Sequence, residues 1–329
     1  MTGPAQDAPV AIVDVGSNSV RLFLCEGADA DGPRGPRFTT VTGLRRGADV
    51  DGTVAPEALE RLDACLQEYG RRMRDAGVTA GVALGTSAVR DAPNRAEVAD
   101  RIAERLGLPL TVLSGAEEAA LAFAGARLAV SGDGTVLVLD VGGGSTELVR
   151  GDAGGVRGAV SLQVGAVRCT EGFLYGDPPT AAQLDALRRA VRPAFAAAVD
   201  RVGGPAPMVG VAGTVTTLAA IRAGRYDPAV VHGSELTVDE VEGMVDRLAV
   251  LPLHARREVP GLDPARAPVI VAGAAIVACA MRAAGADRME VSERDLLDGA
   301  ALILDRIASP VDPALPPAAR LRDGPSPQV

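Results

Sequence analysis

The chain has 329 residues, of which 47% are hydrophobic and 23% charged, a composition typical of a soluble globular protein with about two domains. Its net charge of −9 argues against non-specific binding to nucleic acid. The longest apolar run, 267–281, is shorter than the ~18 residues of a membrane span, so we expect a buried helix and no membrane association. All 33 basic residues are arginines, so any cationic contact to a phosphate must come from a guanidinium group.

The N-terminal sequence and the cysteines bear on the cellular compartment. The first residues, MTGPAQDAP, lack the basic and apolar regions of a signal peptide. Four cysteines are scattered along the chain without the spacing of metal ligands. Reduced thiols are typical of the cytoplasm, so we predict a cytoplasmic protein.

Apolar periodicity predicts alternating strands and helices in both halves of the chain. The first half is predicted to contain a strand hairpin at 10–26, strands at 37–42, 79–84 and 109–113, and helices at 56–75, 94–106 and after Ser114. The second half is predicted to contain strands at 135–140, 146–150, 156–163 and 207–212, and helices at 180–201, 238–249, 264–284 and 294–307. This alternation indicates an α/β protein whose sheets are flanked by helices.

The boundary between the two domains is expected near the end of the helix that follows Ser114, where the sequence continues with SGDG. We therefore assign residues 1–125 to an N-terminal domain and 126–308 to a C-terminal domain. The remaining segment, 309–329, is rich in proline and is predicted to be a disordered tail.

One strand–turn–strand motif occurs twice, with the two copies 126 residues apart: VAIVDVGSNSVRLF at 10–23 and VLVLDVGGGSTELV at 136–149. Turns rich in Gly and Ser expose backbone N–H groups that bind phosphate, unless they are plain hairpin turns. The aspartate before each turn, Asp14 or Asp140, is placed to meet a cation that accompanies the phosphate. The expected phosphate-binding residues are Gly16, Ser17, Asn18 and Ser19 in the first copy, and Gly142, Gly143, Gly144 and Ser145 in the second.

Three glutamates are candidates for chemistry. Glu117 and Glu118 begin a helix that Ser114 can cap, so they either complete the cap or provide a general base. Adjacent helical residues point about 100° apart, so we expect only one of them to face a site. Glu147 shares a strand face with Ser145 and either binds Mg²⁺ together with Asp140, mostly through water, or forms an ordinary cross-strand ion pair.

The arginines and a third glycine turn offer further anion contacts. Arg90 follows a Gly-Thr-Ser turn and is either a bidentate phosphate clamp or the surface partner of Asp91. The segment GVAGTVTT places Gly213 and Thr214 at a predicted helix N-terminus, where an anion is favoured. Weaker candidates for phosphate contacts are Arg21, Arg45, Arg46 and Arg266.

Taken together, these segments resemble the exopolyphosphatase / guanosine-pentaphosphate phosphohydrolase (Ppx/GppA) family of the actin-like ATPase superfamily. The matching segments occur in family order and cover the chain from about residue 10 to residue 307: AIVDVGSNSVRLFL, ALGTSAVRDAPN, VLSGAEEAALAFAGA, LVLDVGGGSTELV, GVAGTVTTLAAI and VPGLDPARAPVIVAGAAIV. The resemblance implies two ribonuclease-H-like α/β domains with a cleft between them.

The resemblance also assigns roles to residues. It implies that Glu118 is the catalytic base and that Arg90 contacts the substrate phosphate. Asp140 and Glu147 would serve Mg²⁺, or another divalent cation, and the scissile phosphate. Asp14 would hold a metal-bound water or support the first turn, and the implied further phosphate contacts are the two Gly-Ser turns, Arg21, Arg266, Gly213 and Thr214.

The implied reaction is release of orthophosphate from the end of inorganic polyphosphate by a water molecule that the glutamate activates. A rival substrate is the 5′-phosphate of guanosine pentaphosphate, and the sequence does not separate the two. An ATP-dependent kinase and an actin-like filament protein are alternatives outside the family. Long family members carry C-terminal helical domains of the HD type; we expect none in this chain, which leaves processivity open. A homodimer is a further expectation, because such proteins often pair.

Overall fold

The computed structural model describes residues 8–30, 32–47 and 52–311, and these form two compact units. The first unit holds the described residues up to Leu113 and those from Ala300 onward, and the second is Ser114–Gly299. The predicted boundary at 125/126 differs from this division because helix α4 (Gly115–Arg127) packs on the strands of the second sheet. Ser309–Pro310, in the predicted tail, forms a short strand in the first unit, and 312–329 lies outside the described residues.

The first unit is built on a mixed sheet in which β6 lies next to β1, β1 next to β2 and β2 next to β5. Its strands are β1 (Val10–Val15), β2 (Val20–Cys25), β5 (Arg37–Thr40), β6 (Ala80–Gly85), β7 (Leu110–Val112) and β14 (Ser309–Pro310), with a separate hairpin of β3 (Gly27–Asp29) and β4 (Gly32–Arg34). Its helices are α1 (Pro56–Asp75), α2 (Ser87–Asp91), α3 (Arg95–Leu106) and α13 (Leu304–Ile307). Helix α1 confirms the predicted helix, since Pro56 starts it and its leucines face the core at helical spacing.

The second unit is built on a six-stranded sheet of order β10-β9-β8-β11-β13-β12. Its strands are β8 (Val136–Val141), β9 (Thr146–Asp152), β10 (Gly155–Leu162), β11 (Met208–Val211), β12 (Glu235–Thr237) and β13 (Arg288–Val291). Its other helices are α5 (Ala166–Phe173), α6 (Ala181–Arg201), α7 (Ala212–Ala223), α8 (Pro228–Val231), α9 (Val238–Ala249), α10 (Leu253–Arg256) and α11 (Ile270–Ala283), and α12 (Leu296–Ala301) begins at its end. None of the helices in the described part of the chain is both long and apolar enough to span a lipid bilayer.

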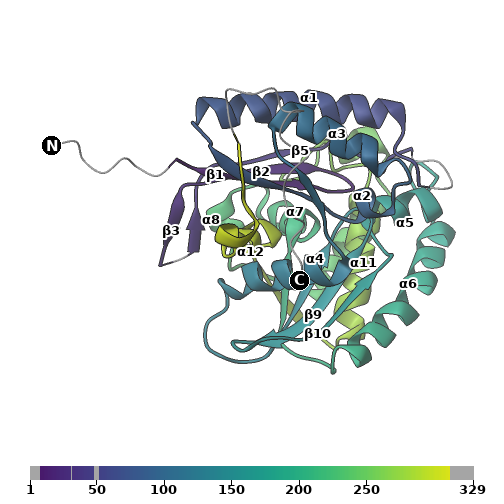
Figure 1. The fold of residues 1–329 in the computed structure, drawn as a ribbon. Helices are drawn as coiled ribbons and strands as arrows, with labels where there is room; N and C mark the ends of the chain where they lie inside the picture. The colour runs from purple at the N-terminus through teal and green to yellow at the C-terminus, as the bar shows by residue number, and fades with distance from the viewer. Residues whose placement is uncertain (1–7, 31, 48–51, 312–329) are drawn as a thin grey trace. The chain divides into compact units, whose positions relative to one another are not determined.

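The two faces of the second sheet are covered by different helices, as Figure 1 shows for α4 and α11. Because side chains alternate along a strand, Leu137, Leu139 and Leu148 point into a core with α6, α9 and α11. Val138 and Val149 point to the opposite face, where α4 covers them. Asp140 and Glu147 continue this second face beyond its apolar part, which places both carboxylates on the α4 side.

The two sheets repeat one strand plan. In the first, β1 is antiparallel to β2, β2 is antiparallel to β5, and β1 is parallel to β6. In the second, β8, β9, β10 and β11 have the same order and the same directions. The sequence repeat is therefore a structural repeat, and the predicted pair of ribonuclease-H-like α/β folds is confirmed. The cleft between them stays a prediction.

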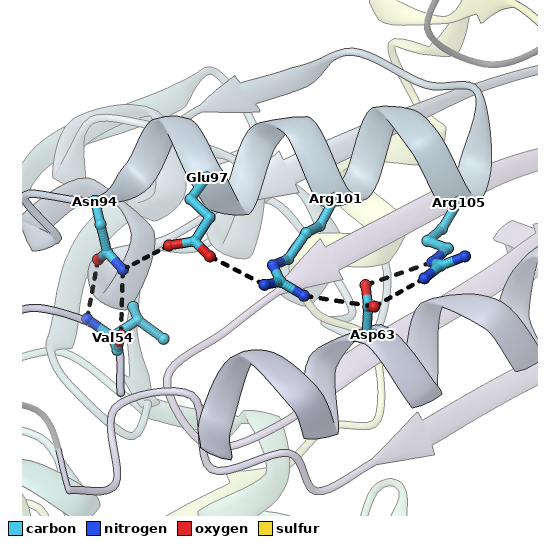
Figure 2. Close-up of polar contacts among 6 residues, drawn as sticks. All are labelled: Val54, Asp63, Asn94, Glu97, Arg101 and Arg105. Atoms are coloured by element: carbon cyan, nitrogen blue, oxygen red, sulfur yellow. Dashed lines mark hydrogen bonds and ion pairs between the residues drawn. The ribbon is translucent and has the colours of Figure 1, made fainter. Parts of the chain in front are cut away.

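Helices α1 and α3 of the first unit are joined at their surface by a chain of polar contacts (Figure 2). Asp63 of α1 accepts hydrogen bonds from Arg105 and pairs with Arg101, both on α3. These bonds, chiefly the one from Arg105, lower the pKa of Asp63. The Asn94 amide, just before α3, bonds both the N–H and the C=O of Val54 at 3.0 and 3.1 Å, so it fixes the segment that leads into α1.

Replacing a helical glycine by alanine should have opposite effects on stability at two positions. A Cβ at Gly125 of α4 would lie 1.8 Å from the Asp295 carbonyl oxygen, so Gly125→Ala should lower the free energy of unfolding by about 1–3 kcal/mol. A Cβ at Gly243 of α9 meets nothing within 4 Å, so Gly243→Ala should raise it by up to about 1 kcal/mol. Urea unfolding of both variants checks this, and the same sign for both would contradict the packing described here.

Candidate functional site

The carbonyl groups of the first Gly-Ser turn accept hydrogen bonds from backbone N–H groups of the same unit. The Gly16 N–H donates to the Ser19 carbonyl at 3.0 Å, which closes the turn between β1 and β2. The Ser17 carbonyl accepts from the Arg45 N–H at 3.0 Å, and the Asn18 carbonyl accepts from the Gly43 N–H at 2.8 Å. A loop that follows β5 therefore braces this turn from its carbonyl side.

The second turn repeats this device with helix α5. Gly142 N–H donates to the Ser145 carbonyl at 3.0 Å, as in the first turn. The carbonyls of the three glycines accept hydrogen bonds from the start of α5: Gly142 from the Ala166 N–H at 2.9 Å, Gly143 from the Val167 N–H at 2.8 Å, and Gly144 from Arg168 Nε at 2.8 Å. The contact is close enough that a Cβ at Gly165 would lie 2.5 Å from the Gly143 carbonyl.

This bracing sets the direction of the amide groups. In a trans peptide the C=O and the following N–H point in opposite directions, so the amides of Gly143, Gly144 and Ser145 face away from α5. Among the described residues, neither Gly143 nor Gly144 donates a backbone hydrogen bond outside regular secondary structure. Successive amides that face one way form a concave site for an anion, which is the chemistry expected of this turn.

The two neighbouring glutamates at the start of α4 have different surroundings. Ser114 Oγ accepts from the Glu117 N–H at 3.2 Å, and Glu117 Oε2 accepts from the Ser114 N–H at 2.7 Å. These bonds complete a capping box and lower the pKa of Glu117, whose side chain is exposed. Glu118 instead turns inward and is 7% exposed, so it is the one that faces the interior.

The carboxylates of β8 and β9 lie in one row across the sheet. Asp140 and Glu147 are directly opposite in the antiparallel ladder, so their side chains share a face. Ser161 of β10 is opposite Glu147 on its other side, and its hydroxyl donates to Glu147 Oε1 at 2.8 Å. A Cβ at Gly115 would lie 2.6 Å from Ser161 Cβ, so the first turn of α4, which carries Glu118, packs on this row.

Burial and mutual repulsion make this carboxylate row costly when it is ionised. Glu147 is 1% exposed, and burial raises its pKa well above the usual value. The nearby charges of Glu118 and Asp140 raise the pKa of Glu147 further, while hydrogen bonds from Ser161 and Ser145 oppose the shift. Such a group favours a bound proton or a nearby cation.

Asp140 and Glu147 offer the donors that magnesium prefers. Mg²⁺ binds oxygen ligands, keeps several waters, and takes only one or two protein carboxylates. No cluster of three or more His, Cys, Asp or Glu side chains suited to a metal ion occurs within the described ranges. Two buried carboxylates on facing strand positions fit a partly hydrated Mg²⁺.

The first unit has a different residue at the position that matches Glu147. There Asp14 of β1 is opposite Arg21 of β2, and the two form an ion pair at 2.8 Å. The guanidinium of Arg21 therefore places a positive charge beside Asp14 without a bound ion. A metal role for Asp14 stays a prediction.

Two other arginines predicted to bind phosphate, Arg90 and Arg266, contact the backbone within their own units. Arg90, in α2, donates from Nη1 to the Leu113 carbonyl at 2.7 Å, at the end of β7. Arg266 is brought to Gly213, where an added Cβ would lie 2.2 Å from its guanidinium. Thr214 Oγ1 donates to the Val141 carbonyl at 2.8 Å, which ties the start of α7 to the residue before the second Gly-Ser turn.

Three residues that shape this region were not predicted from the sequence: Ser161, Gly165 and Arg168. Ser161 reaches Glu147 only through the pairing of β10 with β9, which shifts register between Val156 and Gly158. Arg168 reaches Gly144 only after α5 docks on the turn. Gly165 carried a local signal, because a glycine directly before a helix often marks a close approach of two backbones.

The duplicated sheets, the glycine turn in each unit and the buried carboxylates define an α/β protein of two similarly built units, the fold class that the sequence predicts. Within that class, residues 37–304 match the sequence model of the Ppx/GppA phosphatase family, and the chain belongs to this family.

Known proteins of this family resemble the chain over most of its length. It is 36% identical over 316 residues to exopolyphosphatase 2 of Mycobacterium tuberculosis, an alignment that covers 90% of this chain and 98% of that protein. The crystal structure of an exopolyphosphatase-like protein has a TM-score of 0.82 at 35% identity, covering 91% and 98% of the two chains. An Aquifex aeolicus Ppx/GppA protein has a TM-score of 0.73 at 30% identity, covering 90% and 96%. The chain is therefore a Ppx/GppA phosphatase-family enzyme that is similar to exopolyphosphatases over most of its length.

The raised pKa of Glu147 predicts a pH-dependent stability of the metal-free protein. Because the folded-state pKa lies above the ordinary 4.5, folding takes up a proton above that pH, and wild-type stability falls as the pH rises toward the folded-state pKa. Glu147→Gln has no such proton to take up, so its advantage in melting temperature in EDTA should grow as the pH rises above the ordinary pKa of 4.5.

Glu117→Gln is the matched control for this experiment. The pKa of Glu117 is lowered in the folded state, so its carboxylate stabilises the fold above its ordinary pKa, and that stability is lost as the pH falls. Its removal should therefore lower the melting temperature slightly at neutral pH. Parallel pH profiles of wild type and Glu147→Gln would contradict the burial of an ionisable Glu147.

Proposed function

We propose that this protein is an exopolyphosphatase that hydrolyses the terminal phosphoanhydride bond of inorganic polyphosphate and releases orthophosphate. The observation that carries the proposal is the buried Glu118 at the start of α4, packed on the row that holds Asp140 and Glu147. The similarity to exopolyphosphatases over most of the chain supports the same reaction.

Glu118 would act as the general base. Hydrolysis of a phosphoanhydride requires a water in line with the bond that breaks, and a group that orients the water and accepts its proton. A carboxylate out of bulk water and next to other negative charges holds a proton more readily than an exposed one. The water oxygen would then bond to the terminal phosphorus, its proton would pass to Glu118, and the shortened chain would leave with the bridging oxygen.

The glycine turns and the arginines would hold the phosphate groups. The amides of Gly143 and Gly144 are the proposed contacts for the terminal phosphate. Helix α5 bonds the glycine carbonyls, so these amides already face away from α5. We propose that Arg90, Arg21, Arg266, the Gly213–Thr214 turn and the first turn, 16–19, bind further phosphates. Preformed donors of this kind stabilise the charge that develops during the reaction without reorganising.

Asp140 and Glu147 are the residues that would hold Mg²⁺. When bound, the ion neutralises negative charge on the phosphate oxygens. Ser161 would then orient Glu147 through the hydrogen bond at 2.8 Å, so that one carboxylate oxygen stays free to bind the cation.

We propose that the enzyme acts in the cytoplasm on small polyanions and not on nucleic acid. The four cysteines are free and buried, which suits a reducing compartment. The net charge of −9 disfavours a long nucleic acid, whereas a local group of arginines is sufficient for a phosphate chain. Pairing of two copies stays a prediction.

Adjacent glutamates provide a direct test of the base. Glu118→Gln keeps the shape of the side chain but cannot accept the proton of water, so kcat for orthophosphate release should fall by about 10²–10⁴ with little change in KM. Glu117→Gln keeps a capping side chain on the exposed side of the same turn, so its kcat should stay near that of wild type. Comparable losses in the two variants, or none in Glu118→Gln, would count against Glu118 as the base.

The substrate is tested by orthophosphate release from polyphosphates of several lengths and from guanosine pentaphosphate, with Mg²⁺ and with EDTA. Release from polyphosphate that requires the divalent cation is the expected result. Preference for guanosine pentaphosphate would identify this nucleotide as the substrate of the same hydrolysis. ADP formed from ATP only when an acceptor is added would identify a kinase, and sedimentation of nucleotide-dependent polymers would identify a filament protein.

A further inference from the structure

The segment that carries Arg266 is held by a second, buried arginine. Arg256, in α10, is 4% exposed, and its guanidinium donates to three backbone carbonyls. Nε donates to Leu248 at 3.2 Å and Nη2 to Leu251 at 2.9 Å, at the end of α9. Nη1 donates to the carbonyl of Ala267 at 3.0 Å, so one side chain ties α9 to the residue directly after Arg266.

Burying the Arg256 guanidinium costs free energy, so its presence in the interior requires an explanation. Burial lowers the pKa of Arg256, and the carboxylate of Asp177, 3.5 Å away, partly compensates the charge. A buried ion pair is often no more stable than apolar side chains of similar size. A planar guanidinium does offer several donors in one fixed fork, which no apolar side chain can replace.

The same segment is fixed at two more points. Gly261 has a φ of +83°, and a Cβ there would lie 2.1 Å from the carbonyl of Ala220, so the backbone rests against α7. Asp263 Oδ1 accepts from the Ala265 N–H at 2.9 Å, and the Asp263 carbonyl accepts from the Arg266 N–H at 2.8 Å. These contacts leave the backbone around Arg266 little freedom, with its guanidinium against Gly213 at the start of α7.

We propose that Arg256 is a positioning residue for substrate binding, which acts through the Ala267 carbonyl to keep the Arg266 guanidinium over Gly213 at the N-terminus of α7. Arg256 is buried and does not touch the substrate. Arg266 is the group that would contact a phosphate, together with the amides that begin α7. This inference rests on the proposed function, because the phosphate contact of Arg266 is part of that function.

A double-mutant cycle tests the proposal by calorimetric titration with tripolyphosphate. The variants are Arg256→Met, Arg266→Ala and the combination of both. Each single variant should weaken binding by about tenfold, as expected for a lost charged hydrogen bond. The double variant should bind no more weakly than Arg266→Ala, because Arg256 has no effect once Arg266 is absent.

Steady-state kinetics separates positioning from a general loss of structure. In Arg256→Met, KM for polyphosphate should rise by the same factor as the dissociation constant, while kcat stays within about twofold of wild type. Asp177→Asn is the matched control, because it removes the charge next to Arg256 but leaves its three carbonyl bonds. It should lower the melting temperature and leave KM unchanged. If Arg256→Met does not fold, Arg256→Lys, which keeps the charge but has fewer directed donors, should show a smaller rise in KM.

Three outcomes overturn the proposal. The first is a double variant in which the factors by which the two single variants weaken tripolyphosphate binding multiply. The others are a loss in Arg256→Met that falls on kcat alone, and absence of tripolyphosphate binding by the wild type. Failure of the proposed function is a distinct result. A wild-type protein that binds tripolyphosphate but releases no orthophosphate would refute the hydrolase, and the binding cycle would still decide the role of Arg256.

Discussion

Repulsion among buried carboxylates is the interaction on which the rest of the second unit depends. Asp140 and Glu147 face each other across two strands, and α4 brings Glu118 against the same row. Three acidic groups with little access to water cannot all be ionised without a compensating charge. The charge state of this row is therefore tied to the cations and protons that reach it, while the large apolar core around α11 lies on the other face of the same sheet.

The glycine turn next to this row is rigid for a reason outside the turn. Three consecutive glycines have the highest conformational freedom of any tripeptide, and in isolation they would not keep their amides in one direction. Helix α5 removes this freedom by bonding their carbonyl groups. The glycine turn can therefore be ordered although glycine is flexible, because the missing side chains permit a close contact with α5 that larger residues would block.

Features encoded within a short stretch of sequence could be predicted, and features that need distant segments could not. The strand–turn–strand motif, the capping box at Ser114 and the bounds of α1 follow from local patterns. The predicted helix at 264–284 starts later, at Ile270, because Asp263 holds the preceding amides in a turn. The predicted helix at 294–307 is two helices, since apolar spacing is the same for one helix or two. For the site, which of Glu117 and Glu118 turns inward depends on the packing of α4 on the sheet.

The difference between Arg21 and Glu147 has a consequence for how the two halves diverged. If the halves arose from one repeated unit, a copy with acid at both strand positions must obtain positive charge from its surroundings, whereas a copy with arginine is electrically self-sufficient. The first unit thus compensates Asp14 within its own strand pair, whereas the second unit carries two carboxylates at the corresponding positions. If this arrangement came from duplication, the strand position of Arg21 and Glu147 is where the charge of the two halves diverged.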